Sequence, residues 1–189
     1  MLPYLLVIAG GYLIGQSTSN QLFGKGGKIE PRGEIHLSKN GEALVKLFSP
    51  KNDESVGYAI ILFYSINDIL YSPFKLKLSK SELLKNKEYK STIAKLKDNY
   101  SLKPSDKIHY IEQIEIYPEY RGKGYASYLL KGIISYYKEK GDKYLMLTIG
   151  ADKSSLNNSE LKKFYQRYGF NIIENQGAYK NKMILDLNV

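Results

Sequence analysis

The feature that most constrains the fold is a turn at residues 118–126, which carries two glycines and two cations. The run before it, residues 108–117, is rich in β-branched and aromatic side chains, which is typical of a strand. The stretch after it predicts a helix over about residues 124–140, because its apolar residues recur on one helical face: Tyr128, Leu129, Ile133, Ile134 and Tyr137. The turn therefore joins a strand to a helix.

A turn of this composition suits an anion. The first N–H groups of a helix have no partner within it, and the helix dipole adds partial positive charge there. Gly122 and Gly124 let the backbone approach phosphate oxygens without a Cβ in the way, and Arg121 and Lys123 supply mobile positive charge. The residues alone predict a cradle for a pyrophosphate.

Two motifs carry a family resemblance. Arg121-x-x-Gly124-x-Ala126 resembles the Arg/Gln-x-x-Gly-x-Gly/Ala signature of the GNAT N-acetyltransferases, which bind acetyl-CoA by its pyrophosphate. Further on, Asn158-x-x-Leu161-x-x-Phe164-Tyr165-x-x-Tyr168-Gly169-Phe170 is similar to a later helix of that family. The two motifs lie in the family's order, and the resemblance extends over about residues 105–187.

The expected fold class is α/β, with a GNAT-like mixed, mostly antiparallel central sheet flanked by helices and an N-terminal apolar segment. Short β-prone runs at residues 34–37, 42–48 and 56–64 predict an antiparallel meander. The second half predicts a strand at 144–149, a helix at 159–168, and a final hairpin formed by 170–174 and 182–187. A strand at 74–78 and a helix from Ser79 or Ser81 are also expected, whereas 87–99 is charged and only weakly periodic.

The resemblance implies a cofactor-binding set. Backbone groups of Ile114 and Ile116 are expected to pair with the pantetheine arm of acetyl-CoA, like an added strand. Asn158 is expected to contact the cofactor or the loop above it, with a simple helix cap as the alternative. The cradle itself is assigned to Arg121, Gly122, Lys123, Gly124, Tyr125 and Ala126.

The family resemblance also implies candidate catalytic residues. Tyr165 occupies the position of the family's usual general acid, and the alternative is a ring packed into the core. Glu112 and Glu115 are candidate general bases, and strand alternation predicts that they lie on opposite faces, so that at most one faces the acceptor. The alternative for each is a surface or ion-paired residue. Tyr110 is a third candidate.

Composition excludes several kinds of site. The chain has no cysteine, which rules out disulfides, thiolate nucleophiles and cysteine metal sites. His36 and His109 are far apart in the sequence, so no metal is expected. The net charge is +9, part of which would meet the polyanionic CoA. The cations of 75–107 alternate with acidic residues, which favours solvated surface over a nucleic-acid or membrane patch.

The N-terminal residues are expected to lie outside the main domain. Residues 1–15 are expected to form an apolar helix, shorter than the about 20 residues needed to cross a bilayer. A short membrane or interfacial anchor, a helix docked on another protein, and a signal peptide all stay open. Residues 16–33 read as a Gly-rich polar linker, and 34–189 as the GNAT-like domain. The expected location is cytoplasmic, with attachment to a membrane or larger assembly left open.

The resemblance implies transfer of an acetyl group from acetyl-CoA to a primary amine in a ternary complex. The acceptor stays open among small polyamines, antibiotics, protein N-termini and lysines. The alternative is a non-catalytic GNAT-like scaffold docked by its N-terminus into a phage particle or membrane assembly. A sensor that binds acyl-CoA without turnover is a third possibility.

Overall fold

The computed structural model describes residues 18–23, 31–70, 86–150, 157–174 and 181–188. The strands are β1 (Thr18–Phe23), β2 (Arg32–Leu37), β3 (Ala43–Phe48), β4 (Ser55–Ser65), β5 (Lys107–Ile116), β6 (Tyr144–Thr148), β7 (Asn171–Ile172) and β8 (Lys182–Asp186). The helices are α1 (Ile66–Leu70), α4 (Lys87–Tyr100), a 3₁₀ turn (Pro118–Tyr120), α5 (Tyr125–Glu139) and α6 (Asn158–Gln166).

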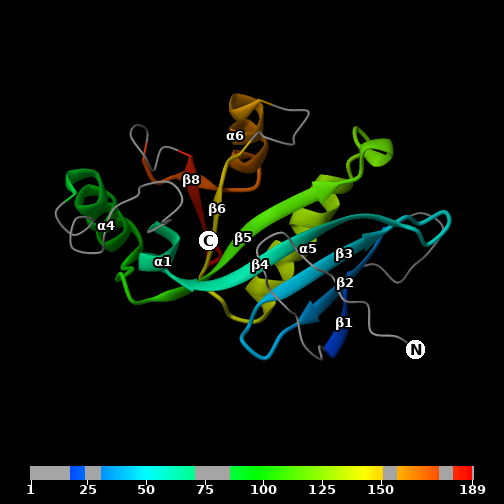
Figure 1. The fold of residues 1–189 in the computed structure, drawn as a ribbon, viewed down its shortest axis with the longest axis horizontal. Coiled ribbons are helices and arrows are strands. Elements are labelled where there is room, and N and C mark those ends of the chain that lie inside the picture. Colours follow the sequence, from blue (N-terminus) through cyan, green and yellow to red (C-terminus); the bar gives the residue numbers. More distant parts are fainter. Residues whose placement is uncertain (1–17, 24–30, 71–85, 151–156, 175–180, 189) are drawn as a thin grey trace.

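The strands form one sheet with the order β1-β2-β3-β4-β5-β6-β8-β7. Each neighbouring pair is antiparallel except β5 and β6, which are parallel. Parallel neighbours need a crossover connection, and α5 provides it. Figure 1 shows β6 and β8 diverging from β5, so that the sheet opens like a V. The predicted mixed, mostly antiparallel sheet flanked by helices is confirmed.

Helices cover both faces of the sheet. On one face α5 buries Leu129, Leu130 and Ile133 against β3, β4 and β5, and the partly buried side chains of α6 join the same core. On the other face α1 and α4 pack over Ile108 and Met146. Truncating a fully buried leucine in such a core costs about 2–5 kcal/mol, so this packing holds the turn before α5 in place.

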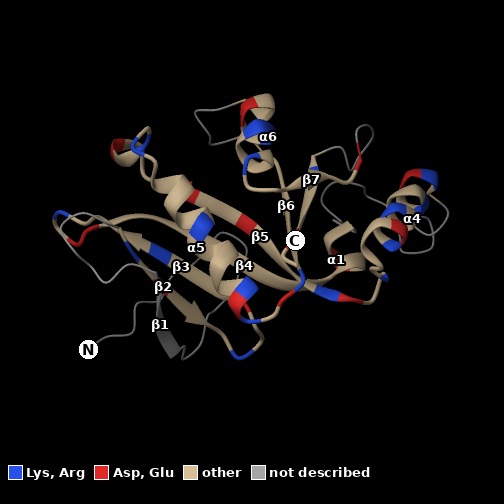
Figure 2. Ribbon diagram, turned by 180° about the vertical axis from the view of Figure 1, so that it is seen from behind, with Lys and Arg blue, Asp and Glu red and all other residues tan. Residues whose placement is uncertain are grey.

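Helix α4 forms where the sequence pattern was weak. Asn86 caps it by accepting a hydrogen bond from the Tyr89 N–H, and Ser101 ends it in a left-handed conformation. Tyr89, Thr92 and Leu96 are its buried residues, at a spacing of one helical face. Acidic and basic residues alternate over its exposed surface, as Figure 2 shows.

The predicted linker at residues 16–33 is wrong in part. Residues 18–23 form β1, which pairs with β2 from Thr18 opposite Leu37 to Phe23 opposite Gly33. An edge strand is stabilised by backbone hydrogen bonds to its neighbour, which do not require apolar side chains. A polar edge strand therefore lacks the hydrophobic pattern by which strands are predicted from sequence. Tyr117, predicted to end the strand at 108–117, precedes the 3₁₀ turn.

Several predictions lie outside the described residues: the apolar helix at 1–15, the strand at 74–78 and the helix from Ser79 or Ser81. Within the described residues, no helix is both long and apolar enough to cross a bilayer.

Gly57 should be required where β4 meets the end of β5. It pairs with Ile116, and a Cβ at this position would lie 2.3 Å from the Glu115 carbonyl oxygen. Because the obstacle is backbone, Gly57→Ala should lower the free energy of unfolding by about 1–3 kcal/mol in urea titrations.

The matched control is Gly150→Ala, because none of the described residues other than its chain neighbours has an atom within 4 Å of a Cβ there. We expect this variant to unfold within about 0.5 kcal/mol of the wild type. Equal stability of the two variants would contradict the close approach of the strands.

Candidate functional site

The site lies where β5 and β6 separate. The register between them ends at Ile111 opposite Leu147, whereas β5 stays paired with β4 as far as Ile116. The backbone of residues 112–116 therefore has an open edge on the β6 side. A cavity of about 770 Å³ occupies this gap. Its wall comes from β5, the turn before α5, the end of β6, and one face of α6.

The turn after β5 brings backbone donors to one end of the cavity. Gly122 and Gly124 have φ angles of 73° and 80°, which L side chains rarely adopt. Helix α5 begins directly afterwards, with Ser127 and Tyr128 N–H groups donating to the Gly124 carbonyl. In the described part of the chain, no backbone carbonyl accepts from the N–H groups of residues 122–126. These donors are available to an anion.

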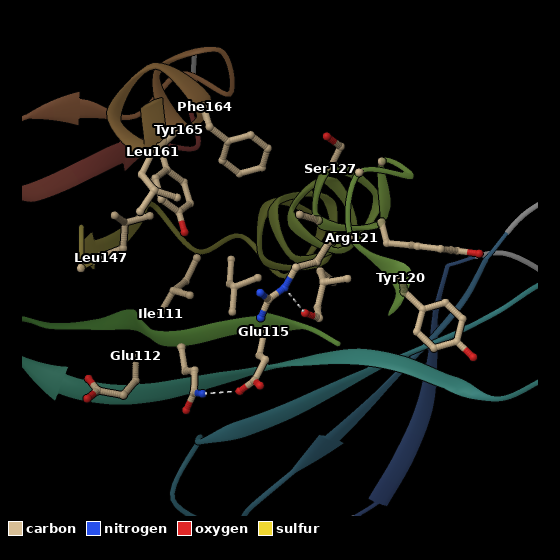
Figure 3. A pocket seen from close by; sticks show the side chains of 18 of the residues that line it. Ile111, Glu112, Glu115, Tyr120, Arg121, Ser127, Leu147, Leu161, Phe164 and Tyr165 are labelled. Atoms are coloured by element: carbon tan, nitrogen blue, oxygen red, sulfur yellow. Dashed lines mark hydrogen bonds between the residues drawn. The ribbon is translucent and has the colours of Figure 1, made fainter. Parts of the chain in front are cut away.

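The two cations of the turn differ in position. Arg121 lies in the cavity wall, and its Nε donates to the Ile116 carbonyl oxygen at 2.9 Å, which fixes the guanidinium beside the strand end (Figure 3). Lys123 instead donates from Nζ to the Glu119 carbonyl oxygen at 2.9 Å and lies over the Tyr120 ring. It is not part of the cavity wall.

Most of the predicted cofactor residues are brought together. The cavity wall includes Ile114, Ile116, Arg121, Gly122, Gly124, Tyr125 and Ala126. Asn158 is exposed at the start of α6 and outside that wall. The cap of this helix is Asn157, whose side chain accepts from the Glu160 N–H while the Glu160 carboxylate accepts from the Asn157 N–H. The helix cap is thus Asn157 rather than Asn158, and a contact of Asn158 with the cofactor or the loop above it stays a prediction.

Tyr165 reaches the cavity from α6. Its ring packs edge-on against Phe164 and Phe170, and its hydroxyl points down towards β5 and Ile111 (Figure 3). Burial raises the pKa of Tyr165 to about 12, so the phenol is protonated at neutral pH. None of the described residues makes a hydrogen bond with this hydroxyl. The ring of Tyr165 therefore packs in the core while its O–H faces the cavity, and its role as the acid stays a prediction.

Glu112 and Glu115 were expected on opposite faces of the strand, and this is wrong. Ile60 pairs with Gln113 but Ile61 pairs with Ile111, so Glu112 is an extra residue in a β-bulge. The bulge interrupts the alternation of side chains along β5. In Figure 3 both carboxylates project from the side of β5 opposite Ile111. Both lie in the cavity wall.

Two side chains that the sequence analysis missed hold Glu115. The Tyr58 hydroxyl donates to Glu115 Oε2 at 2.9 Å, and Gln113 Nε2 donates to the same oxygen at 2.8 Å. Gln113 Nε2 also donates to the Tyr58 hydroxyl at 3.0 Å. Burial, together with the bond to Glu115, raises the pKa of Tyr58 to about 12. Glu112, by contrast, is exposed to the cavity.

Tyr110 is unsuited to be a base. Burial raises its pKa to about 12, and its hydroxyl lies 2.8 Å from Thr148 Oγ1. His109 is also buried; its ring lies tilted against the Tyr137 ring, with the centroids 4.1 Å apart, and its Nε2 lies 3.3 Å from Asp142. No group of three or more His, Cys, Asp or Glu side chains within the described ranges could hold a metal.

Comparisons with known proteins add the following. No curated protein matches the chain. Among solved structures, PaiA N-acetyltransferase from Thermoplasma acidophilum in complex with coenzyme A has 13% identity and a TM-score of 0.44, over 77% of this chain and 60% of that one. A mosquito arylalkylamine N-acetyltransferase (like 5b) has 15% identity and a TM-score of 0.48, over 76% and 74% of the two chains. An N-acetyltransferase from Staphylococcus aureus Mu50 has 22% identity and a TM-score of 0.42, over 79% and 70%.

A family model also matches the chain. The model of the acetyltransferase (GNAT) family matches residues 50–170, from the turn before β4 to the end of the second motif. This range contains β5, the turn at residues 118–126, α5, β6 and α6. The family predicted from the two motifs, and with it the class of acyl-CoA N-acyltransferases, is confirmed. The chain belongs to the acetyltransferase (GNAT) family.

Proposed function

We propose that the chain transfers an acetyl group from acetyl-CoA to a primary amine, with both substrates bound at once. The observation that carries this proposal is the cavity between β5 and β6. It has unpaired backbone donors and Arg121 at one end, and the Tyr165 hydroxyl near the point where the strands close. An anion-binding end and a proton-donating end are what an acyl-CoA transferase needs.

The residues present fit the cosubstrate. Pyrophosphate oxygens would accept from the free N–H groups of the turn and from the Arg121 guanidinium. The open edge of β5 over residues 112–116 offers N–H and C=O groups to the amides of the pantetheine arm, as a missing neighbour strand would. The arm would then end near Ile111 and Leu147, with its thioester close to Tyr165.

In the reaction the amine nitrogen forms a bond to the thioester carbon, and the carbon–sulfur bond breaks. Tyr165 donates its proton to the departing sulfur and regains one from water. Its pKa of about 12 keeps that proton in place until the thiolate forms. The proton lost by the amine goes to a carboxylate, directly or through a water molecule.

The two glutamates have different roles towards the amine. Glu112 follows Ile111, where the strands close and the thioester would lie, so we assign it the proton transfer. Glu115 is held by Tyr58 and Gln113, and a carboxylate fixed in this way is suited to orienting an ammonium group. Both assignments use the bulge, which places the two carboxylates on one side of β5.

The scaffold and sensor alternatives predict different behaviour. A scaffold has no need to bind acetyl-CoA, and a sensor binds it without turnover. Attachment of residues 1–15 to a membrane or assembly is a separate question, because the activity proposed here uses only residues within the described part of the chain.

Arg121→Glu should weaken acetyl-CoA binding by about 100-fold, because it replaces a charge-assisted contact to phosphate with a repulsion. Isothermal titration calorimetry measures the dissociation constant. The matched control is Lys123→Glu, which makes the same charge change two residues away, outside the cavity wall. Equal losses of acetyl-CoA affinity in the two variants would contradict the anion-binding role of the turn. Absence of acetyl-CoA binding by the wild type would exclude the proposed enzymatic activity.

Tyr165→Phe should lower kcat by about 10²–10⁴-fold and leave the dissociation constant of acetyl-CoA unchanged, because only proton donation is removed. The assay is release of CoA thiol with polyamines, aminoglycosides, peptide N-termini and lysine peptides as acceptors. Tyr168→Phe, in the turn directly after this helix, is the control and should keep wild-type kcat. Full activity of Tyr165→Phe would exclude its role as the acid.

Glu112→Gln should lower kcat by about 10²-fold or more with little change in the KM of the acceptor. Glu115→Gln should mainly raise that KM. Steady-state kinetics with the best acceptor measures both constants, and the reverse pattern would exchange the two roles.

A further inference from the structure

A buried lysine lies beside the point where β5 and β6 separate. Lys182 on β8 is the cross-strand partner of Thr148, the last residue of β6, so both side chains project from the same face of the sheet. Only 8% of Lys182 is exposed. Lysine is rarely so buried without a specific role for its charge. The Tyr110 ring lies next to it, with its centroid 5.8 Å from Lys182 Nζ.

Three polar groups form a chain at this place. Among its contacts, Lys182 Nζ donates to Thr148 Oγ1 at 3.1 Å. The Tyr110 hydroxyl donates to the same oxygen at 2.8 Å. An ammonium group can only donate, and a hydroxyl offers two lone pairs and one proton. Both lone pairs of Thr148 are therefore in use, and its own proton is left to donate elsewhere.

The direction of that proton follows from position. Thr148 lies in the cavity wall, directly after Leu147, the last residue of β6 that pairs with β5. Within the described residues, no group accepts a hydrogen bond from the Thr148 hydroxyl. The opposite orientation, in which Thr148 donates to Tyr110, would leave the spare proton on a hydroxyl outside the cavity wall.

We infer that the Thr148 hydroxyl, polarised by the buried Lys182 ammonium, donates a hydrogen bond to the acyl oxygen of the bound thioester. The inference rests on the proposed function, which brings the thioester to this end of the cavity. As the amine attacks, the carbonyl π electrons move onto that oxygen, and they return when the carbon–sulfur bond breaks. A donor already bonded to a cation is a stronger donor, and a buried charge acts across a low dielectric.

The two residues have different roles. Thr148 would touch the reacting oxygen and is a catalytic residue in that sense. Lys182 acts through Thr148 and is a positioning residue. Sequence analysis missed both, because residues 148 and 182 become neighbours only through the pairing of β6 with β8.

The test is isotope-edited infrared spectroscopy of acetyl-CoA labelled with ¹³C at the acyl carbonyl, bound to the full chain. A hydrogen bond lowers the carbonyl stretching frequency. We expect a band below that of free acetyl-CoA in the wild type and in Thr148→Ser, and a band close to the free value in Thr148→Val. Lys182→Met should give an intermediate band, and Lys95→Met, which changes a lysine on α4, should give the wild-type band.

The kcat values of the variants should fall as their carbonyl bands approach the frequency of free acetyl-CoA. Thr148→Val should lose about 10–10³-fold in kcat at an unchanged dissociation constant for acetyl-CoA, and Thr148→Ser should recover most of it. A purely structural role would change thermal stability without moving the carbonyl band of the folded variants.

The outcomes separate the two hypotheses. If acetyl-CoA does not bind to the wild type, the proposed function fails, and this inference fails with it. If acetyl-CoA binds and its carbonyl band is the same in the wild type and in Thr148→Val, only the inference is overturned. If Thr148→Val does not fold, the Lys182→Met variant decides. A carbonyl band at the wild-type frequency in that variant overturns the inference equally.

Discussion

The site depends on one interruption of backbone hydrogen bonding. β5 and β6 stop pairing after Ile111 and Leu147, and β5 continues alone on that side as far as Ile116. A strand edge with unpaired N–H and C=O groups is normally a liability that proteins cover. Here the turn before α5 and the face of α6 enclose it as a cavity. The open edge, the cradle and the Tyr165 hydroxyl are useful only because they surround the same gap.

The second constraint is the bulge at Glu112. One extra residue in β5 changes which side chains share a face, and it brings Glu112 and Glu115 to the same side of the strand. Beyond the bulge, Gln113 faces Tyr58, and the two together hold the Glu115 carboxylate. Regular alternation would have separated the two carboxylates and left Glu112 on the opposite face from Gln113 and Glu115.

Electrostatics divides the cavity into donor and acceptor regions. Burial keeps the Tyr165 phenol protonated, with a pKa of about 12. The free N–H groups before α5 and the Arg121 guanidinium add further donors, whereas Glu112 and Glu115 supply the acceptors. A protein of net charge +9 thus has carboxylates where a cationic amine would enter, and positive charge where a pyrophosphate would bind.

The sequence by itself determined the glycine turn between a strand and a helix, the family and the sheet class, because these depend on local rules. Positive φ angles call for Gly122 and Gly124, and hydrophobic periodicity marks the strand and helix that flank them. Only the tertiary structure decided β1, the bulge, and the partners of Glu115 and Thr148. Tyr58 is 57 residues from Glu115, and Lys182 is 34 residues from Thr148. Strand register sets such contacts, and a shift of one residue in register reverses the face of every side chain.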